Sequence, residues 1–415
     1  MSDPLRASLP SYAFFASLLG MAGLPIYIHA PKFFVDTYGL TLATLGFALF
    51  ALRLIDFVQD PLFGRLAARS ADLRAWPAWI GGGVMSLGMI GLFHVSAPIS
   101  PVLWFCLTLT LVFSGFSFLS IKFYAQGVVA FGEAGQLHLA RWRETGNLLG
   151  VCIAAIAPTL LLTVSDRPFS MFSIGFAILL FFALLAMHAQ WQHKGDVEAD
   201  NSSGFQALFK DHMVRQMLFL AVLNTAPVAV SSTLFLFFVE SRLGQPDAAG
   251  PLLILFFLAA ACSAPIWTAL AHRFKIKRVL LSAMSLAIAS FAYAFFLGQG
   301  DVAVFALICF ASGMTLGADL ALLPAIFAKR LVQSGNSAEL GFGFWNFASK
   351  LSLALAAVLV LPLVEFYGFR VGQDNSEQGL WALSFGYAAI PCFLKVVAIL
   401  MVLKIEFEDA EHARL

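Results

Sequence analysis

Two carboxylates stand four residues apart inside a long apolar segment. The segment covers residues 41–66 and holds Asp56 and Asp60, with Arg53 one turn before the first of them. Residues at positions i and i+4 share one face of a helix, with Cβ atoms about 5–6 Å apart. Ionisable groups at bilayer depth cost roughly 2.5–3.5 kcal/mol each and usually mark an ion or solute pathway. Two acids this close need a proton, a cation or a basic side chain between them, so the pair predicts coupling chemistry.

The composition places most of this chain in a membrane. Hydrophobic residues make up 60% of the 415 residues and charged residues only 12%, whereas a soluble domain carries about 25% charged residues. The five cysteines lie in apolar segments and form no CxxC pair or disulfide framework. The sequence also lacks a basic patch with interleaved aromatics and the nucleotide, HExxH and GxSxG motifs of enzymes. We therefore expect an integral membrane protein that is no enzyme, with no nucleic-acid partner, metal or cofactor.

Apolar segments long enough to cross a bilayer recur along the chain. A spanning helix needs about 20 apolar residues. The widest polar gap separates six segments from six, which predicts bundles at 1–192 and 213–415 joined by a linker at 193–212. We expect an all-α membrane protein of twelve transmembrane helices in two six-helix bundles. The expected helices are 11–35, 41–66, 77–97, 100–131, 141–164, 168–192, 213–240, 249–272, 277–298, 302–329, 340–367 and 379–405.

The basic residues of the loops predict the orientation. Loops on one side of this topology hold 13 lysines and arginines, and loops on the other side hold 4. Basic loops face the cytoplasm, so we expect both termini and the linker there, in a bacterial inner membrane. A basic element follows the second helix of each half, at 64–74 and 272–278. This repeat is typical of six-plus-six transporters, whose substrate cavity lies at the midplane between halves.

Further ionisable residues interrupt the apolar segments of both halves. Their signs nearly balance, and unpaired buried charges are strongly penalised, so we expect a mutually compensated network in a wet cavity. A structural role remains open for each of them, and for Arg53 it would be to hold Asp56. The other polar groups expected at depth are Lys122, Arg143, Glu144, Asp319, Asn346, Lys350 and Lys395.

The segment 53–64 resembles the helix 2 signature of the glycoside–pentoside–hexuronide:cation symporters. This is the melibiose-permease group of the major facilitator superfamily. The resemblance implies the major facilitator fold and a secondary transporter that works by alternating access. It extends over most of the chain through residues 12–41, Arg143 with Gly146 and Gly150, 224–226, 231–233, 264–267, and 342–343 with Lys350.

The resemblance assigns coupling roles to several positions. The family's two helix 2 acids bind the coupling cation, and Asp56 and Asp60 match them. Its helix 11 lysine near the cation site matches Lys350. Its third acid, on helix 4, falls at Lys122, and an ammonium there would take the cation's place. We therefore expect H⁺ rather than Na⁺ as the coupling ion.

The same resemblance indicates which residues contact the solute. The family's substrate-binding arginine matches Arg143, its helix 1 acid matches Gly20, and its helix 4 tryptophan matches Gln126. The surplus of cationic donors indicates an anionic or zwitterionic solute, and the resemblance implies a small polar, sugar-like one. The expected contacts are Arg143, Gln126, Gly20, Tyr124, Asp319 and Asn346, with Arg53 and Glu144 in support.

Two alternatives stay open at this point. A lipid or lysolipid flippase of the same fold would use the apolar helix 1 face at 18–21. A receptor or scaffold would show no flux, and the substitution Asp56→Asn would leave its function intact. For the transporter, the expected partners are a small-molecule solute, a coupling ion and the lipid bilayer, with the protein as a monomer.

Overall fold

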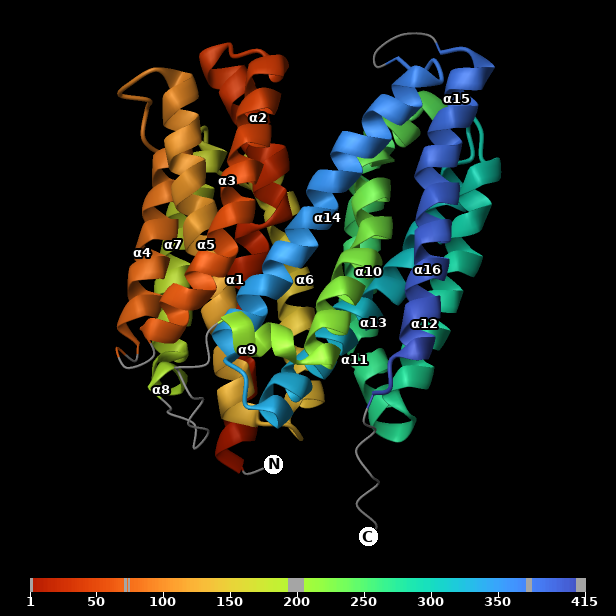
Figure 1. Cartoon of the computed structure of the whole chain (residues 1–415). Helices are drawn as coiled ribbons and strands as arrows, with labels where there is room; N and C mark the ends of the chain where they lie inside the picture. Colours follow the sequence, from red (N-terminus) through yellow and green to blue (C-terminus); the bar gives the residue numbers. More distant parts are fainter. Residues whose placement is uncertain (1–2, 71–72, 74, 193–204, 371–374, 408–415) are drawn as a thin grey trace. The chain divides into compact units, whose positions relative to one another are not determined.

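The computed structural model describes residues 3–70, 73, 75–192, 205–370 and 375–407 (Figure 1). All the regular secondary structure within these residues is helical, which confirms the prediction of an all-α chain. The residues fall into two compact units, Met1–Asp211 with Ala328–Phe347, and His212–Phe327 with Ala348–Leu415. Nothing is described for the side chains of residues 3–7, 24–25, 27–28, 42–43, 53 and 57.

The first unit begins with a helix that the sequence predicted as one continuous span. Gly23 divides it into two helices, α1 and α2. The short helix α9 lies in the predicted linker, whose residues 193–204 are outside the described part. The helices are α1 (Asp3–Ala22), α2 (Leu24–Tyr38), α3 (Leu42–Arg69), α4 (Trp76–Phe93), α5 (Pro101–Phe131), α6 (Gln136–Leu161), α7 (Pro168–Ala186), α8 (His188–Trp191) and α9 (Phe205–Lys210).

The second unit contains α-helices together with short π-helical and 3₁₀-helical segments. A five-residue π-helical segment, η2, extends the C-terminal end of α10, and a second one, η5, joins α15 to α16. The elements are α10 (His212–Phe237), η2 (Phe238–Arg242), η3 (Pro246–Ala248), α11 (Ala249–Arg273), α12 (Ile276–Phe291), η4 (Ala292–Phe296), α13 (Val302–Ser334), α14 (Ala338–Phe366), α15 (Glu377–Ser384), η5 (Phe385–Ala389) and α16 (Ile390–Lys404).

The helices match the apolar segments of the sequence. Nine stretches of the described residues are long and apolar enough to cross a membrane, and one of them, Pro101–Leu161, contains both α5 and α6. The stretch Ser8–Ala22 of α1 is apolar but shorter. The helix bounds are thus consistent with twelve spans.

The unit boundary differs from the predicted division at the linker. Ala328–Phe347, the end of α13 and the start of α14, belongs to the first unit. There Lys329 pairs with Glu133 at 3.0 Å, and Arg330 pairs with Asp211 at 3.0 Å. These contacts join segments that are far apart in sequence. The polar gap at 193–211 alone therefore does not show that residues 328–347 belong to the first unit.

Helix starts follow from local sequence. Proline occupies the first turn of α4, α5 and α7, where a missing N–H costs no hydrogen bond. Thr41 caps α3 by accepting a hydrogen bond from the Thr44 N–H at 3.2 Å. The α2 helix ends at Tyr38 and is capped by Gly39, whose φ of 66° is a conformation that glycine adopts without strain.

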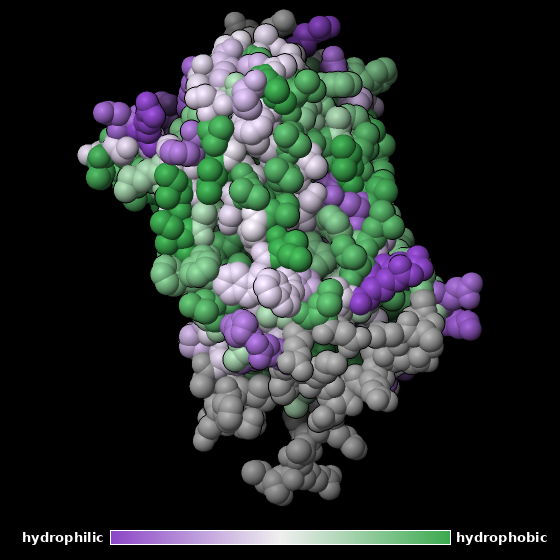
Figure 2. Space-filling model, turned by 90° about the vertical axis from the view of Figure 1, so that its left-hand side faces the viewer, coloured by the Kyte–Doolittle hydropathy of each residue, from purple (hydrophilic) through white to green (hydrophobic). Residues whose placement is uncertain are grey.

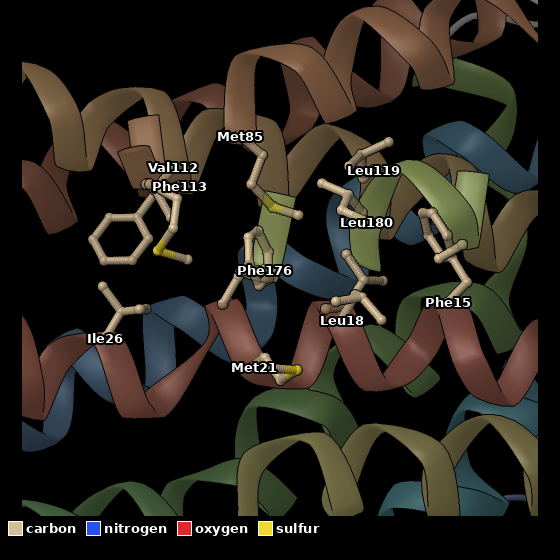
Figure 3. Packing of buried hydrophobic residues seen from close by; sticks show 14 of the residues in the cluster. Phe15, Leu18, Met21, Ile26, Met85, Val112, Phe113, Leu119, Phe176 and Leu180 are labelled. Carbon is tan, nitrogen blue, oxygen red and sulfur yellow. The ribbon is translucent and has the colours of Figure 1, made fainter. Parts of the chain in front are cut away.

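Large apolar side chains fill the interior of the first unit. Aromatic, methionine and leucine side chains from α1, α4, α5 and α7 interdigitate there (Figure 3). The same cluster includes Leu52 of α3 and Leu139 of α6, so it also packs the helices that carry the polar groups of the first unit. The labelled members are Phe15, Leu18, Met21, Ile26, Met85, Val112, Phe113, Leu119, Phe176 and Leu180.

Apolar residues also dominate the outer surface. Figure 2 shows a face with a broad hydrophobic band that contains few hydrophilic residues. On α4 and α7 the exposed side chains include Ile80, Leu87, Ile178 and Phe181, which are 52–66% exposed. Large apolar surfaces of this kind are covered by lipid in membrane proteins.

Candidate functional site

The paired acids of α3 are buried at the middle of that helix. Asp56 is 6% exposed and Asp60 is 0% exposed. The Gln59 side chain donates a hydrogen bond to the Asp56 carboxylate at 2.6 Å, and the Ser117 hydroxyl donates to the same oxygen at 3.2 Å. The Ser114 hydroxyl donates to the Gln59 carbonyl oxygen at 2.9 Å. Donors from α3 and α5 therefore hold the first carboxylate in place.

Sequence reasoning missed the residues that orient Asp56. Ser114 and Ser117 lie three residues apart in an apolar helix, so they present hydroxyls on one face. That spacing is a signal that could have identified them. Arg53 lies within α3, but its side chain is outside the described part, so its expected support of Asp56 stays a prediction.

Lys122 of α5 is buried, with 6% exposure. The carboxylate that acts on it electrostatically is Glu339 of α14, which belongs to the same unit. Among the described side chains, no ion pair within 4.0 Å joins Lys122 to Asp56 or Asp60. The predicted coupling role of Lys122 beside the two acids stays a prediction.

A second buried cluster surrounds Arg143 at the start of α6. Its Nε donates to the Glu144 carboxylate at 2.7 Å, and its guanidinium lies 3.8 Å from the centre of the Tyr124 ring. The Tyr124 hydroxyl donates to the same Glu144 oxygen at 2.9 Å. Arg143 and Glu144 are 2% and 1% exposed. The structure thus brings three predicted site residues together.

Three polar atoms near this cluster have no hydrogen-bond partner among the described residues. They are Arg143 Nη2, the Tyr12 hydroxyl and the Thr145 hydroxyl. A buried polar group without a partner costs about 1–3 kcal/mol. Proteins often keep a buried polar group of this kind where a ligand or a water molecule supplies the missing hydrogen bond.

Gly20 lies where α1 and α6 touch through their backbones. A Cβ atom at Gly20 would lie 2.0 Å from the Asn147 main-chain oxygen. Gly146 and Gly150 approach α1 equally closely, since their Cβ atoms would lie 2.2 Å and 1.9 Å from the oxygens of Ala13 and Ser17. The geometry gives Gly20 a packing role and leaves no space there for the acid of the related family.

The remaining predicted residues lie on two helices, α5 and α14. Gln126 of α5 is 9% exposed, and Asn346 of α14 is half-buried in the first unit. Lys350, one turn further along α14, is half-buried and belongs to the second unit. The predicted roles of these three residues stay predictions.

In the second unit, Asp319 of α13 pairs with Lys395 of α16. The Lys395 ammonium also donates to the Asn224 side-chain oxygen at 2.8 Å. All three side chains are 5–8% exposed. The sequence had placed Asp319 at the solute site and left Lys395 without a partner, because residues 76 positions apart show no local pattern.

Comparison with known proteins agrees with this fold. The family described as MFS/sugar transport protein matches residues 11–409. A crystal structure of the E. coli fucose:proton symporter is similar, with a TM-score of 0.65 and 16% identity over 96% of this chain and 98% of that one. No curated protein matches. The chain therefore belongs to the MFS/sugar transport protein family, and it is a membrane transporter rather than an enzyme, as the sequence resemblance predicted.

Proposed function

We propose that this transporter is a symporter for a small polar, sugar-like solute and works by alternating access. Asp56 and Asp60 are the coupling groups of this proposal. The observation that supports it best is the burial of both carboxylates, one turn apart, halfway along the 28-residue helix α3. Buried acids in a membrane helix are expensive and are typical of ion and proton pathways.

The proposed coupling ion is H⁺. The related symporters complete their cation site with a third acid on helix 4, and this chain has Lys122 at that position. An ammonium supplies no oxygen ligand for Na⁺, whose site would then have two carboxylates rather than three. A pair of carboxylates can still accept and release protons.

The proposed solute contacts of the first unit are the Arg143 cluster, Gln126 and Asn346. Asp319 is the proposed contact of the second unit. Charged donors form stronger hydrogen bonds than neutral ones, so a guanidinium held in place by Glu144 is suited to polar oxygens of a solute. The proposal also places both termini in the cytoplasm, because the basic loops lie on that side.

Uptake into proteoliposomes tests the coupling. The panel consists of radiolabelled L-fucose, melibiose, glucuronate and lysophosphatidylcholine, each with a pH gradient, a Na⁺ gradient or neither. We expect a sugar-like solute to accumulate with the pH gradient. Asp56→Asn and Asp60→Asn should each reduce that accumulation at least about tenfold, because an amide side chain cannot take up and release a proton as a carboxylate does.

The matched control is Asp36→Asn. Asp36 is an exposed acid on α2 that pairs with Lys32 at 3.5 Å, and its substitution should leave accumulation unchanged. Unchanged accumulation in Asp56→Asn would contradict the proposal. Accumulation that needs Na⁺ but ignores pH would contradict H⁺ as the ion, and flux of the lysolipid alone would favour a flippase.

A further inference from the structure

One end of the second unit carries a group of exposed cations. Arg273 ends α11, and Arg278 lies in the first turn of α12. The Lys277 ammonium donates hydrogen bonds to two main-chain oxygens at the end of α16, at 2.9 Å and 2.8 Å. It thereby ties the α11–α12 turn to the end of α16, where Lys404 lies (Figure 1). Arg273, Arg278 and Lys404 are all exposed and form the basic end of this unit.

The basic end has few counter-charges nearby. Among the described side chains, none of its three cations forms an ion pair within 4.0 Å. Glu406 is the described acid that follows these helix ends, whereas Asp247 precedes α11 and Asp301 follows α12, at the opposite ends of those helices. Exposed charges of one sign attract an oppositely charged partner. The basic end is therefore suited to an anion.

Exposed apolar side chains adjoin the basic end. Phe274 is 52% exposed, and the Arg273 guanidinium lies 5.7 Å from the centre of its ring. In the last turns of α16, Leu400 and Leu403 are 54% and 53% exposed. On α12, which contacts α16, Leu286 is 48% exposed. Cations beside exposed aromatic and aliphatic groups are typical of surfaces at a membrane interface.

An anionic phospholipid matches both features of this surface. Its phosphate has oxygens that a guanidinium can bind through two hydrogen bonds, and its acyl chains cover apolar helix surface. We propose that the basic end binds the headgroup of an anionic phospholipid, whose chains lie on the exposed leucines of α12 and α16. This lipid is a partner separate from the transported solute, because no residue of this surface belongs to the proposed coupling or solute-binding groups.

Native mass spectrometry of the full-length protein measures this binding. The protein in micelles of a neutral detergent is titrated with phosphatidylglycerol or with phosphatidylcholine that carries the same acyl chains. Each cation near an anionic headgroup strengthens binding about fivefold, so we expect the wild type to bind phosphatidylglycerol at least about tenfold more tightly. Arg273→Gln and Arg278→Gln should each reduce that preference about three- to fivefold and leave the affinity for phosphatidylcholine unchanged.

Two further variants separate a lipid site from general positive charge. Arg69 is exposed in the last turn of α3, as Arg273 is in the last turn of α11. Arg69→Gln therefore removes the same charge from a basic loop of the first unit, and it should leave the preference unchanged. Arg273→Lys keeps the positive charge and should retain most of the preference, because an ammonium also binds phosphate.

Three results would overturn the proposal. The first is equal affinity of the wild type for the two lipids. The second is an equal loss of preference in Arg69→Gln and Arg273→Gln, because the preference would then follow the total charge of the protein. The third is a loss in Arg273→Lys as large as in Arg273→Gln, which would show a structural role for the guanidinium. Displacement of phosphatidylglycerol by millimolar inorganic phosphate would also contradict a lipid site, since it would indicate a site for a soluble anion.

The last residues of the chain provide one more test. Glu408, Asp409 and Glu411 lie outside the described residues. We expect the preference for phosphatidylglycerol in the wild-type chain, which contains these acids. A preference that is seen only after all three are replaced by their amides would show that these acids neutralise the basic end, and it would contradict the proposal.

Discussion

The contact between α1 and α6 makes a quantitative prediction for Gly20→Ala. The added Cβ would lie 2.0 Å from the Asn147 oxygen, about 1.4 Å closer than ordinary contacts, which begin at 3.4 Å. The opposing atom belongs to the main chain of a helix, so rotation of a side chain cannot relieve the clash. Overpacking costs about 1–3 kcal/mol, and we expect about 3 kcal/mol here. The corresponding loss of melting temperature is roughly 5–10 °C.

The assay is thermal unfolding of the purified protein, followed by tryptophan fluorescence. The matched control is Gly175→Ala in α7, where an added Cβ would meet no atom within 4 Å. That substitution should raise stability by about 0.5–1 kcal/mol, because glycine is a poorer helix former than alanine. A Gly20→Ala variant that melts at or above the wild type would refute the packing argument. It would also reopen a direct role for Gly20 in solute binding.

Two other predictions concern the buried charges. Glu144→Gln should lower stability by about 3–5 kcal/mol, because it leaves Arg143 buried without its counter-charge, whereas Tyr124→Phe should cost only about 1 kcal/mol for one hydrogen bond. Melting curves of the two variants compare these costs, and equal losses would contradict the assignment of the ion pair. Lys395→Met alone should destabilise the second unit by a similar 3–5 kcal/mol, and adding Asp319→Leu should restore most of it. A double variant less stable than Lys395→Met would contradict that pairing.

The helices were predictable because a bilayer allows few alternatives. A spanning segment must satisfy its backbone hydrogen bonds internally, so each long apolar run predicts a helix. The pairing of Asp56 and Asp60 on one face follows from helical periodicity alone. Their burial was predictable too, since both stand among apolar residues on a helix of the expected length.

Contacts between helices were not predictable from these patterns. The Lys395–Asp319 pair and the influence of Glu339 on Lys122 depend on how distant segments pack. Gly20 shows the same limit, because the resemblance assigned it a solute contact while its neighbour on α6 decides what fits there. A single sequence records which groups must be paired in a membrane, but their partners are set by the packing of the helices.

One arrangement recurs in both units. Arg143 uses Nε to bind Glu144, and Asp319 binds Lys395 through one oxygen. In the described part of the chain, Arg143 Nη2 and the other Asp319 oxygen have no hydrogen-bond partner. The paired atom holds the side chain in a fixed orientation and offsets the cost of burying its charge. The second atom is then presented to a ligand without a further loss of side-chain entropy. We therefore expect Arg143 and Asp319 each to form an ion pair and to contact the solute. A substitution of Glu144 or Lys395 should then weaken solute binding, even though neither needs to touch the solute.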